Sequence, residues 1–305
     1  MATIIRTKSD IFLKYLFGQA CNEDLLIDFI NSVFDDVGQT RVLSAKVQNP
    51  FNIKQCKNDK DSILDIKCET DKNEIINIEM QLIGSADYSK RALYYWAKCY
   101  SAQLNESEVY GLLKPVISIH LLDFNLFEFD EKHKKAKVLT DNKMHHCFGI
   151  FEQQNKDLCF SKDFQMHIIE MPKLSEQLEN NKSLVSWIDF FKNIKEGDDM
   201  TYLADNQTIM QKAMNQFKRF TADDEMREIY EAREKAAHDK ASFIYTGFLE
   251  GQAQGIKKGL AQGRYDEKFE TALTFQKMED KIYYLKDVVS RKKQLVPMIT
   301  EQIAN

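Results

Sequence analysis

Residues 61–82 constrain the fold more than any other part of the chain. Two strand-like runs, DSILDIKCE at 61–69 and EIINIEMQL at 74–82, flank the turn formers TDKN. We expect a β-hairpin centred near Lys72. Along its second strand apolar residues alternate with polar ones: Ile76, Ile78 and Met80 against Asn77, Glu79 and Gln81. One face of this strand should therefore pack on a core while the other presents a polar row.

The predicted register places Asp65 on the first strand nearly opposite Glu79 on the second. Opposed residues have Cβ atoms about 4.5–5.5 Å apart, and a slip of one residue would separate them. Two carboxylates this close repel unless a cation lies between them or one is protonated. Mg²⁺ suits such a pair because it binds one or two carboxylates and completes its shell with waters and phosphate oxygens. We therefore predict a metal site at Asp65 and Glu79, for Mg²⁺ or alternatively Mn²⁺.

Gln81 lies on the same predicted face as Glu79. Its neutral amide can orient a water but cannot act as a strong base, so the metal would have to generate the nucleophile. The alternative for all three residues is the exposed polar face of an ordinary hairpin. Lys67 shares a face with Asp65.

The remaining patterns place helices on both sides of a strand cluster. Ser9 and Asp10 open a short helix ending at Gly18, and Asn22 is expected to cap a longer helix over 22–36. Another helix, 87–104, follows the hairpin. Further strands are predicted at 114–124 and 163–171, and helices at 183–194 and 206–241. This order indicates an α/β core with helical additions.

Glycine recurs every four residues near the C-terminal end, at 247, 251, 255, 259 and 263. Each glycine costs a helix about 1 kcal/mol relative to alanine. The segment is therefore either a flexible linker or a helix whose backbone packs closely on another chain. We predict a main domain over 1–240 and a helical tail over 241–305 that serves homo-oligomerisation.

Composition excludes several classes of protein. A formal net charge of −5 is not that of a basic nucleic-acid coat, so DNA binding would need a local patch or metal ions. The N-terminus lacks a signal-peptide core, and PVISIHLLDFNLF is too short to span a bilayer. Six scattered cysteines without a C-x-x-C pair fit a reducing compartment, so we expect a cytoplasmic protein away from membranes. His145, His146 and Cys147 are adjacent, a spacing unsuited to one zinc ion.

LDIK followed by NIEMQ resembles the D…E-x-K signature of PD-(D/E)xK nucleases, with glutamine replacing lysine. The chain more specifically resembles the transposase-like, recombination-promoting nuclease branch. DIFLKYLFG, DYSKRALYYWAKCYSAQL, YGLLKPVISIHLLDF and the glycine-rich EGQAQGIKKGLAQG carry this resemblance, which covers about residues 5–265.

The resemblance implies a restriction-endonuclease-like core, a central mixed sheet flanked by helices, and Mg²⁺-dependent cleavage of DNA. Asp65 and Glu79 become the metal ligands, and Gln81 takes the usual lysine position. Lys67 is then either a solvated side chain or a migrated substitute for that lysine. The resemblance also implies that Tyr88 and Arg91, on the helix after the motif, bind the substrate. Asp10 and Lys14 match the opening motif, but no role follows for them.

The leading hypothesis is therefore a metal-dependent endodeoxyribonuclease, transposase-like and recombination-promoting. A second hypothesis is a weak or inactive nuclease fold that acts as an oligomeric interaction module. A third is a phosphodiesterase acting on RNA.

Overall fold

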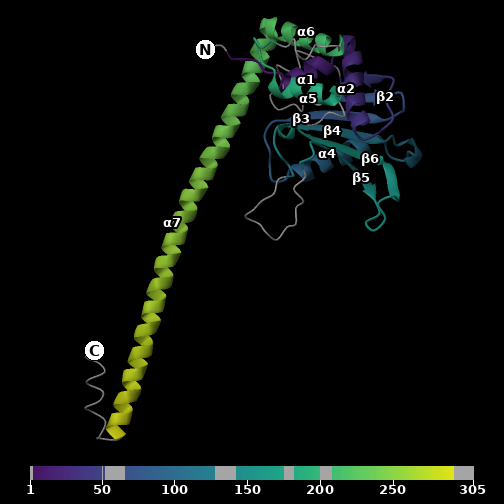
Figure 1. Ribbon diagram of the computed structural model, residues 1–305. Coiled ribbons are helices and arrows are strands. Elements are labelled where there is room, and N and C mark those ends of the chain that lie inside the picture. The colour runs from purple at the N-terminus through teal and green to yellow at the C-terminus, as the bar shows by residue number, and fades with distance from the viewer. Residues whose placement is uncertain are drawn as a thin grey trace. The chain divides into compact units, whose positions relative to one another are not determined.

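The computed structural model describes residues 3–49, 51, 66–127, 142–174, 182–199 and 208–291 (Figure 1). Its α-helices are α1 (Asp10–Phe17), α2 (Glu23–Asp36), α4 (Tyr88–Ser101), α5 (Lys182–Asn193), α6 (Thr208–Ala222) and α7 (Asp224–Arg291). Its strands are β1 (Ala45–Val47), β2 (Ile66–Thr70), β3 (Ile75–Gln81), β4 (Val116–Leu122), β5 (His145–Phe151) and β6 (Cys159–Glu170). Short 3₁₀ turns lie at Ala20–Asn22, Tyr110–Leu112 and Met171–Lys173.

The strands form one mixed sheet in the order β1-β2-β3-β4-β6-β5. β1, β2 and β3 pair antiparallel, β3 and β6 each pair parallel with β4, and β5 returns antiparallel on β6. Helix α4 makes the crossover from β3 to the parallel strand β4, as parallel pairing requires. This mixed sheet with flanking helices confirms the predicted restriction-endonuclease-like α/β fold.

The two faces of the sheet are covered unequally (Figure 1). Helices α1, α2, α5 and α6 cover one face and share the main core with the sheet residues Ile76, Ile78 and Met80. Helix α4 covers the other face, where Tyr88 and Ala92 pack on Leu122, Met166 and Ile168. The smaller cover over the second face leaves its polar side chains closer to solvent.

The predicted hairpin is confirmed over the residues that the structure describes. Ile66 pairs with Ile78 and Lys67 with Asn77, which centres the hairpin on Lys72. Burial along β3 alternates as predicted after Ile75, since Ile76, Ile78 and Met80 are buried while the polar residues between them are partly exposed. β3 is nevertheless an interior strand, because β4 pairs along its whole length.

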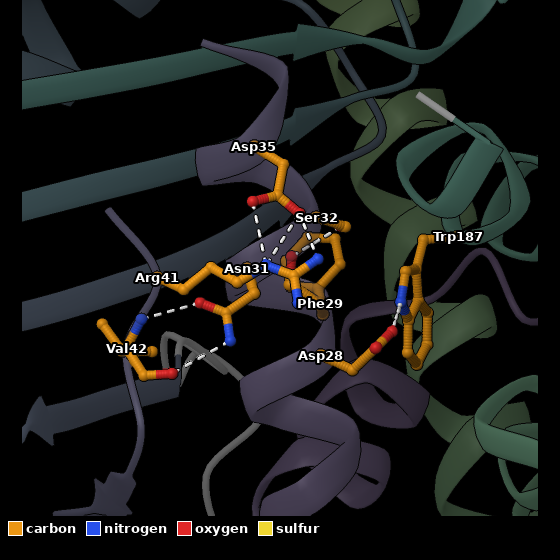
Figure 2. A network of polar contacts seen from close by, with 8 residues as sticks. All are labelled: Asp28, Phe29, Asn31, Ser32, Asp35, Arg41, Val42 and Trp187. Atoms are coloured by element: carbon orange, nitrogen blue, oxygen red, sulfur yellow. Dashed lines mark hydrogen bonds and ion pairs between the residues drawn. The ribbon is translucent and has the colours of Figure 1, made fainter. Parts of the chain in front are cut away.

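Side chains of α2 tie this helix to two distant segments (Figure 2). The amide of Asn31 bonds both backbone groups of Val42, accepting from its N–H at 2.8 Å and donating to its carbonyl at 3.0 Å. The indole N–H of Trp187 on α5 donates to Asp28 at 2.8 Å. The Asn31 pair mimics a backbone bridge and fixes the chain where it leaves α2 for β1.

The N-terminal segment is held by elements from the last third of the main unit. Thr7 donates from its N–H to the carbonyl of Ile194 at 3.1 Å and from its hydroxyl to that of Phe190 at 2.6 Å. The ring of Phe12 on α1 contacts Phe217 and Phe220 on α6, with centroids 5.0 and 5.3 Å apart. The N-terminal segment of this unit therefore packs against its C-terminal helices α5 and α6.

Three predictions about elements need correction. Ser9 caps α1 as expected, but Asn22 makes no capping hydrogen bond to α2; its side chain is held by donation from Nδ2 to the carbonyl of Leu16 at 2.9 Å. Strands β1 and β5 were not predicted, and β6 is longer than the predicted 163–171. The predicted helix 206–241 is divided at Asp223, whose carboxylate accepts the N–H groups of Glu225 and Met226 and starts α7.

The structure divides into two compact units, Met1–Glu234 and Lys235–Asn305. Helix α7 continues through all five glycines of the four-residue repeat. A Cβ added at any of them would meet no atom of the described residues within 4 Å. Contacts among the described residues therefore give no reason for these glycines. The predicted boundary at residue 240 stays a prediction.

Candidate active site

Strand β3 and helix α4 bring three of the predicted site residues together. Glu79 and Gln81 are two residues apart on β3, so both side chains leave the sheet on the face covered by α4. Nη2 of Arg91 lies 2.6 Å from Oε1 of Glu79 and also bonds Oε1 of Gln81. One guanidinium nitrogen thus lies between the carboxylate and the amide.

The local sequence explains why Arg91 reaches this position. Tyr88 and Ala92 anchor α4 on the sheet, and Arg91 follows Tyr88 by three residues, which places both on one side of the helix. The guanidinium carbon of Arg91 lies 5.6 Å from the centroid of the Tyr88 ring, a cation–π distance. The side chain of Glu79 is 13% exposed and that of Arg91 is 39% exposed, so the arginine forms the solvent side of the cluster.

His120 lies beneath this cluster at the same level of the neighbouring strand, because β3 and β4 pair Glu79 with His120. Its Nδ1 is 2.9 Å from the hydroxyl of Tyr88 and 3.7 Å from Oε2 of Glu79. Burial, and then the positive charge of Arg91, lower the pKa of His120 to about 4. The histidine is therefore neutral near pH 7, and its approach to Glu79 is not an ion pair.

Tyr88 is buried, with 1% of its surface exposed. Burial, and then the charge of Glu79, raise the pKa of the Tyr88 hydroxyl, so it keeps its proton. The other ring nitrogen of His120, Nε2, is also buried and has no hydrogen-bond partner within the described part of the chain. The Tyr88–His120 contact thus fixes α4 on β4 from inside the protein.

Asp65, the predicted partner of Glu79, lies outside the described residues, immediately before β2. No group of three or more His, Cys, Asp or Glu side chains within the described ranges is arranged to hold a metal ion. Glu79 and Gln81 nevertheless offer the oxygen donors that Mg²⁺ prefers. They already accept a cationic nitrogen, so their donor set fits a positive ion.

The mixed sheet with Glu79 and Gln81 on one strand is like that of a nuclease, and a comparison with protein families agrees with this assignment. The family model described as PD-(D/E)XK nuclease family transposase matches residues 7–247. The chain belongs to this family. No match was found among curated proteins, and none among solved structures.

The two residues that match the family's opening motif, Asp10 and Lys14, make structural contacts in this protein. Lys14 is buried, and its Nζ donates to the carbonyl of Asn49 at 2.5 Å, fixing the segment after β1. Asp10 accepts from Arg233 at 3.3 Å. Neither residue contacts Glu79, Gln81 or Arg91 in these interactions.

A second carboxylate lies on the same face of the sheet as Glu79. Glu170 is fully buried and accepts the N–H groups of Leu126 and Phe127, at 2.5 and 3.0 Å, and the ammonium of Lys173 at 2.6 Å. A carboxylate with this many donors is saturated by the protein itself. Its contacts are those of a structural group that closes the turn after β4.

The run His145–Cys147 divides between the two faces of the sheet. Nδ1 of His145 is 2.7 Å from Asp36 and its Nε2 is 2.9 Å from His167, while Sγ of Cys147 is 3.9 Å from the far nitrogen of His167. His146 points to the opposite face, where its Nε2 is 3.4 Å from Glu170. The three adjacent residues therefore do not converge on one point.

Sequence reasoning missed His120. It lies in the apolar run VISIHLL, every residue of which is buried. A single ionisable residue in such a run was a signal, but its meaning depends on β3 pairing directly with β4 in a register that places His120 next to Glu79.

The described ranges contain no helix long and apolar enough to cross a membrane.

Proposed function

We propose that the protein is a metal-dependent DNA endonuclease, with Glu79, Gln81 and Asp65 as its catalytic residues. The observation that carries this proposal is the joint contact of Glu79 and Gln81 with one cationic group. The membership of the chain in a nuclease family of transposases supports a phosphodiester substrate. Continuing the observed hairpin register by one pair would bring Asp65 opposite Glu79, so the proposed ligand pair spans two strands.

Each residue has a distinct proposed role. Asp65 and Glu79 would hold Mg²⁺, for which Mn²⁺ could substitute. The ion, when bound, would supply Lewis-acid chemistry by polarising the phosphate and lowering the pKa of a water. Gln81 would accept a hydrogen bond from the attacking water and orient it toward phosphorus. Arg91 donates to a phosphate oxygen of the substrate, as its forked guanidinium is suited to do.

The role of Tyr88 follows from its burial. Its hydroxyl bonds His120 and not the surface, so we propose that Tyr88 supports the substrate site by positioning α4 and Arg91. Of these two residues, only Arg91 is proposed to contact the substrate, at a phosphate oxygen.

Plasmid nicking tests this function. Supercoiled plasmid is incubated with Mg²⁺ and wild type, Asp65→Ala, Glu79→Ala or the control Glu106→Ala, an exposed carboxylate in the loop after α4. Wild type and Glu106→Ala should nick, while the two site variants should lose activity at least a hundredfold, typical for the loss of an essential catalytic group. Equal nicking by all four would remove Asp65 and Glu79 from the mechanism.

DNA is the proposed substrate and recombination the proposed setting, because the matched family is one of transposases. Competition between labelled DNA and RNA of the same sequence separates this proposal from a phosphodiesterase acting on RNA. Cys21, Cys68, Cys147 and Cys159 form no disulfide within the part of the chain that the structure describes, which supports a cytoplasmic location.

The alternative, an oligomeric interaction module, is favoured by the surface of α7. Seven large apolar side chains between 243 and 260 are exposed: Phe243, Ile244, Tyr245, Phe248, Leu249, Ile256 and Leu260. An isolated helix with five glycines is not stabilised by propensity, and helices gain most stability by packing. We propose that a second copy of α7 covers this surface.

Residue size favours an antiparallel pair. Tyr245, Leu249, Gln252, Ile256, Gly259 and Gly263 alternate in spacings of four and three, which lines one side of a helix. In two copies crossing antiparallel at Gln254, Tyr245 would face the partner's Gly263 and Leu249 the partner's Gly259. Large residues opposite small ones interdigitate, whereas parallel copies would leave glycine opposite glycine.

Truncation after residue 240 tests the role of the tail. Light scattering should show self-association of the full chain and its loss in the truncated chain. If the truncated chain self-associates as before, the tail is not the contact. If self-association is lost and nicking never occurs, the interaction module replaces the nuclease as the better reading.

A further inference from the structure

We propose that Arg91 is a displaceable internal cation, which holds Glu79 and Gln81 until a divalent metal ion replaces it and then turns to a phosphate of the substrate. This inference rests on the proposed nuclease function and adds an order of events to it. The metal ion and the arginine would compete for the same carboxylate, so the occupancy of one regulates the other.

The first argument is the identity of the bonded atoms. A single nitrogen, Nη2 of Arg91, contacts Oε1 of Glu79 at 2.6 Å and Oε1 of Gln81. These are oxygens that a divalent ion would need. Two cations placed at the same carboxylate oxygen repel each other, so each weakens the binding of the other.

The second argument is the difference in freedom between the two partners. The side chain of Glu79 is 13% exposed and rises from an interior strand bonded on both edges, so it is held in place. That of Arg91 is 39% exposed and lies on the solvent side. Displacement therefore moves the arginine and leaves the carboxylate where it is.

The third argument is what Arg91 retains after it leaves Glu79. Its guanidinium lies 5.6 Å from the ring centroid of Tyr88, and that ring is anchored through its hydroxyl to His120. Its other guanidinium nitrogens make no hydrogen bond within the described part of the chain. A guanidinium with donors to spare, kept beside the site by an aromatic face, is suited to bind a phosphate through two bonds.

The charge around the cluster also depends on Arg91. The guanidinium of Arg91 lies 2.6 Å from the carboxylate of Glu79 and offsets its negative charge by direct contact. Without it, Glu79 would attract a metal ion more strongly.

The test measures metal binding separately from cleavage. The full chain and its Arg91→Gln variant are titrated with Mn²⁺, and free Mn²⁺ is followed by electron paramagnetic resonance. Arg91→Gln should bind Mn²⁺ about tenfold more tightly than wild type, since a neighbouring charge shifts an ionisation equilibrium by at least that factor. The same variant should nick plasmid DNA more slowly, because the phosphate contact is lost.

Two further variants make the result specific. Lys90→Gln removes the same charge from the adjacent, exposed position of α4 and should bind Mn²⁺ like wild type. Glu79→Gln removes the competed carboxylate, so adding Arg91→Gln to it should bring no further gain in affinity. Circular dichroism of each variant checks that it is folded, and Arg91→Lys, which keeps the charge, should lie between wild type and Arg91→Gln.

The outcomes separate this inference from the nuclease proposal. Unchanged or weaker Mn²⁺ binding by a folded Arg91→Gln overturns the displaceable cation, even if wild type nicks DNA. Tighter binding with no nicking by any form supports the displaceable cation and removes the nuclease. Absence of Mn²⁺ binding in every form overturns both.

Discussion

The hydroxyl of Tyr88 lies 2.9 Å from Nδ1 of His120, so helix α4 is anchored to β4 directly beneath the carboxylate of Glu79. Both partners are buried, and no residue of the motif D…E-x-Q takes part in the bond. The site therefore depends on a polar contact one strand away from its acidic motif.

Removing this bond should destabilise the protein. Tyr88→Phe keeps the ring but leaves His120 without its partner, and an unsatisfied buried group costs about 1–3 kcal/mol. Urea denaturation should show this loss, while Tyr94→Phe, on the exposed side of α4, should change the unfolding free energy by less than about 0.5 kcal/mol. Equal stability of the two variants would contradict the anchoring role.

Charges at positions 81 and 91 should be coupled. Gln81→Lys adds a second cation beside Arg91 and should reduce plasmid nicking. Combining it with Arg91→Gln restores one cation at the cluster, so the double variant should nick roughly tenfold faster than the product of the single effects predicts. Independent, multiplicative effects would show that the two side chains do not share one charge site.

The contacts of α2 predict unequal costs for two polar groups (Figure 2). Asn31→Asp replaces the donor to Val42 by an oxygen and buries a charge, so it should cost about 2–4 kcal/mol. Arg41 makes three hydrogen bonds to Asp35, but its side chain is 66% exposed. Arg41→Ala should therefore cost less than about 1 kcal/mol. Chemical denaturation that ranks the two variants the other way would be at odds with the burial argument.

His167 should make stability depend on pH. Burial, and then the charge of His145, lower the pKa of His167 to about 3, although Asp36 opposes this shift. The unfolded chain binds this proton near pH 6.5 and the folded protein does not, so stability is present above pH 6.5 and falls as pH falls toward 3. His167→Gln should reduce the slope of unfolding free energy against pH by up to ~1.4 kcal/mol per unit. His238→Gln, at an exposed position of α7, should leave the slope as it is.

Two glycines of α7 should respond differently to the same substitution. Gly247→Leu and Gly259→Leu each raise helix propensity by nearly 1 kcal/mol, and a Cβ at either position meets no neighbour among the described residues. Only Gly259 lies on the proposed contact stripe, opposite the partner's Leu249. Gly259→Leu should therefore weaken self-association, measured by analytical ultracentrifugation, while Gly247→Leu should preserve it. If both variants associate like wild type, the antiparallel pairing is wrong.

Local pattern was enough to predict the hairpin and most helices. Alternation along β3 and the turn at 70–73 set the register of Ile66 with Ile78, because a slip would turn the apolar residues to the polar side. Strand β5 was not predicted because its apolar and polar residues alternate poorly. Its pairing with β6 also contains register shifts. The missing cap at Asn22 was not predicted, because donation from its Nδ2 to the carbonyl of Leu16 orients the side chain, and propensity does not describe such a local bond.

The candidate site was predictable along one strand and not across strands. Glu79 and Gln81 share a face by the periodicity of β3 alone. The contact of Arg91 with both, and the presence of His120 below, depend on how α4 crosses the sheet and on the parallel register of β3 with β4. These are non-local facts, fixed by the main fold and not by neighbouring residues in the sequence.

The bonds of Thr7 to Phe190 and Ile194, and the packing of Phe12 on Phe217 and Phe220, have a consequence for biosynthesis. Translation releases the N-terminal segment first, but the surface that receives Phe12 is complete only once residue 220 has been made. Until then part of the apolar face of helix α1 is uncovered on the nascent chain, a state open to chaperones and to aggregation. Completion of this unit is therefore expected late in translation or after release from the ribosome.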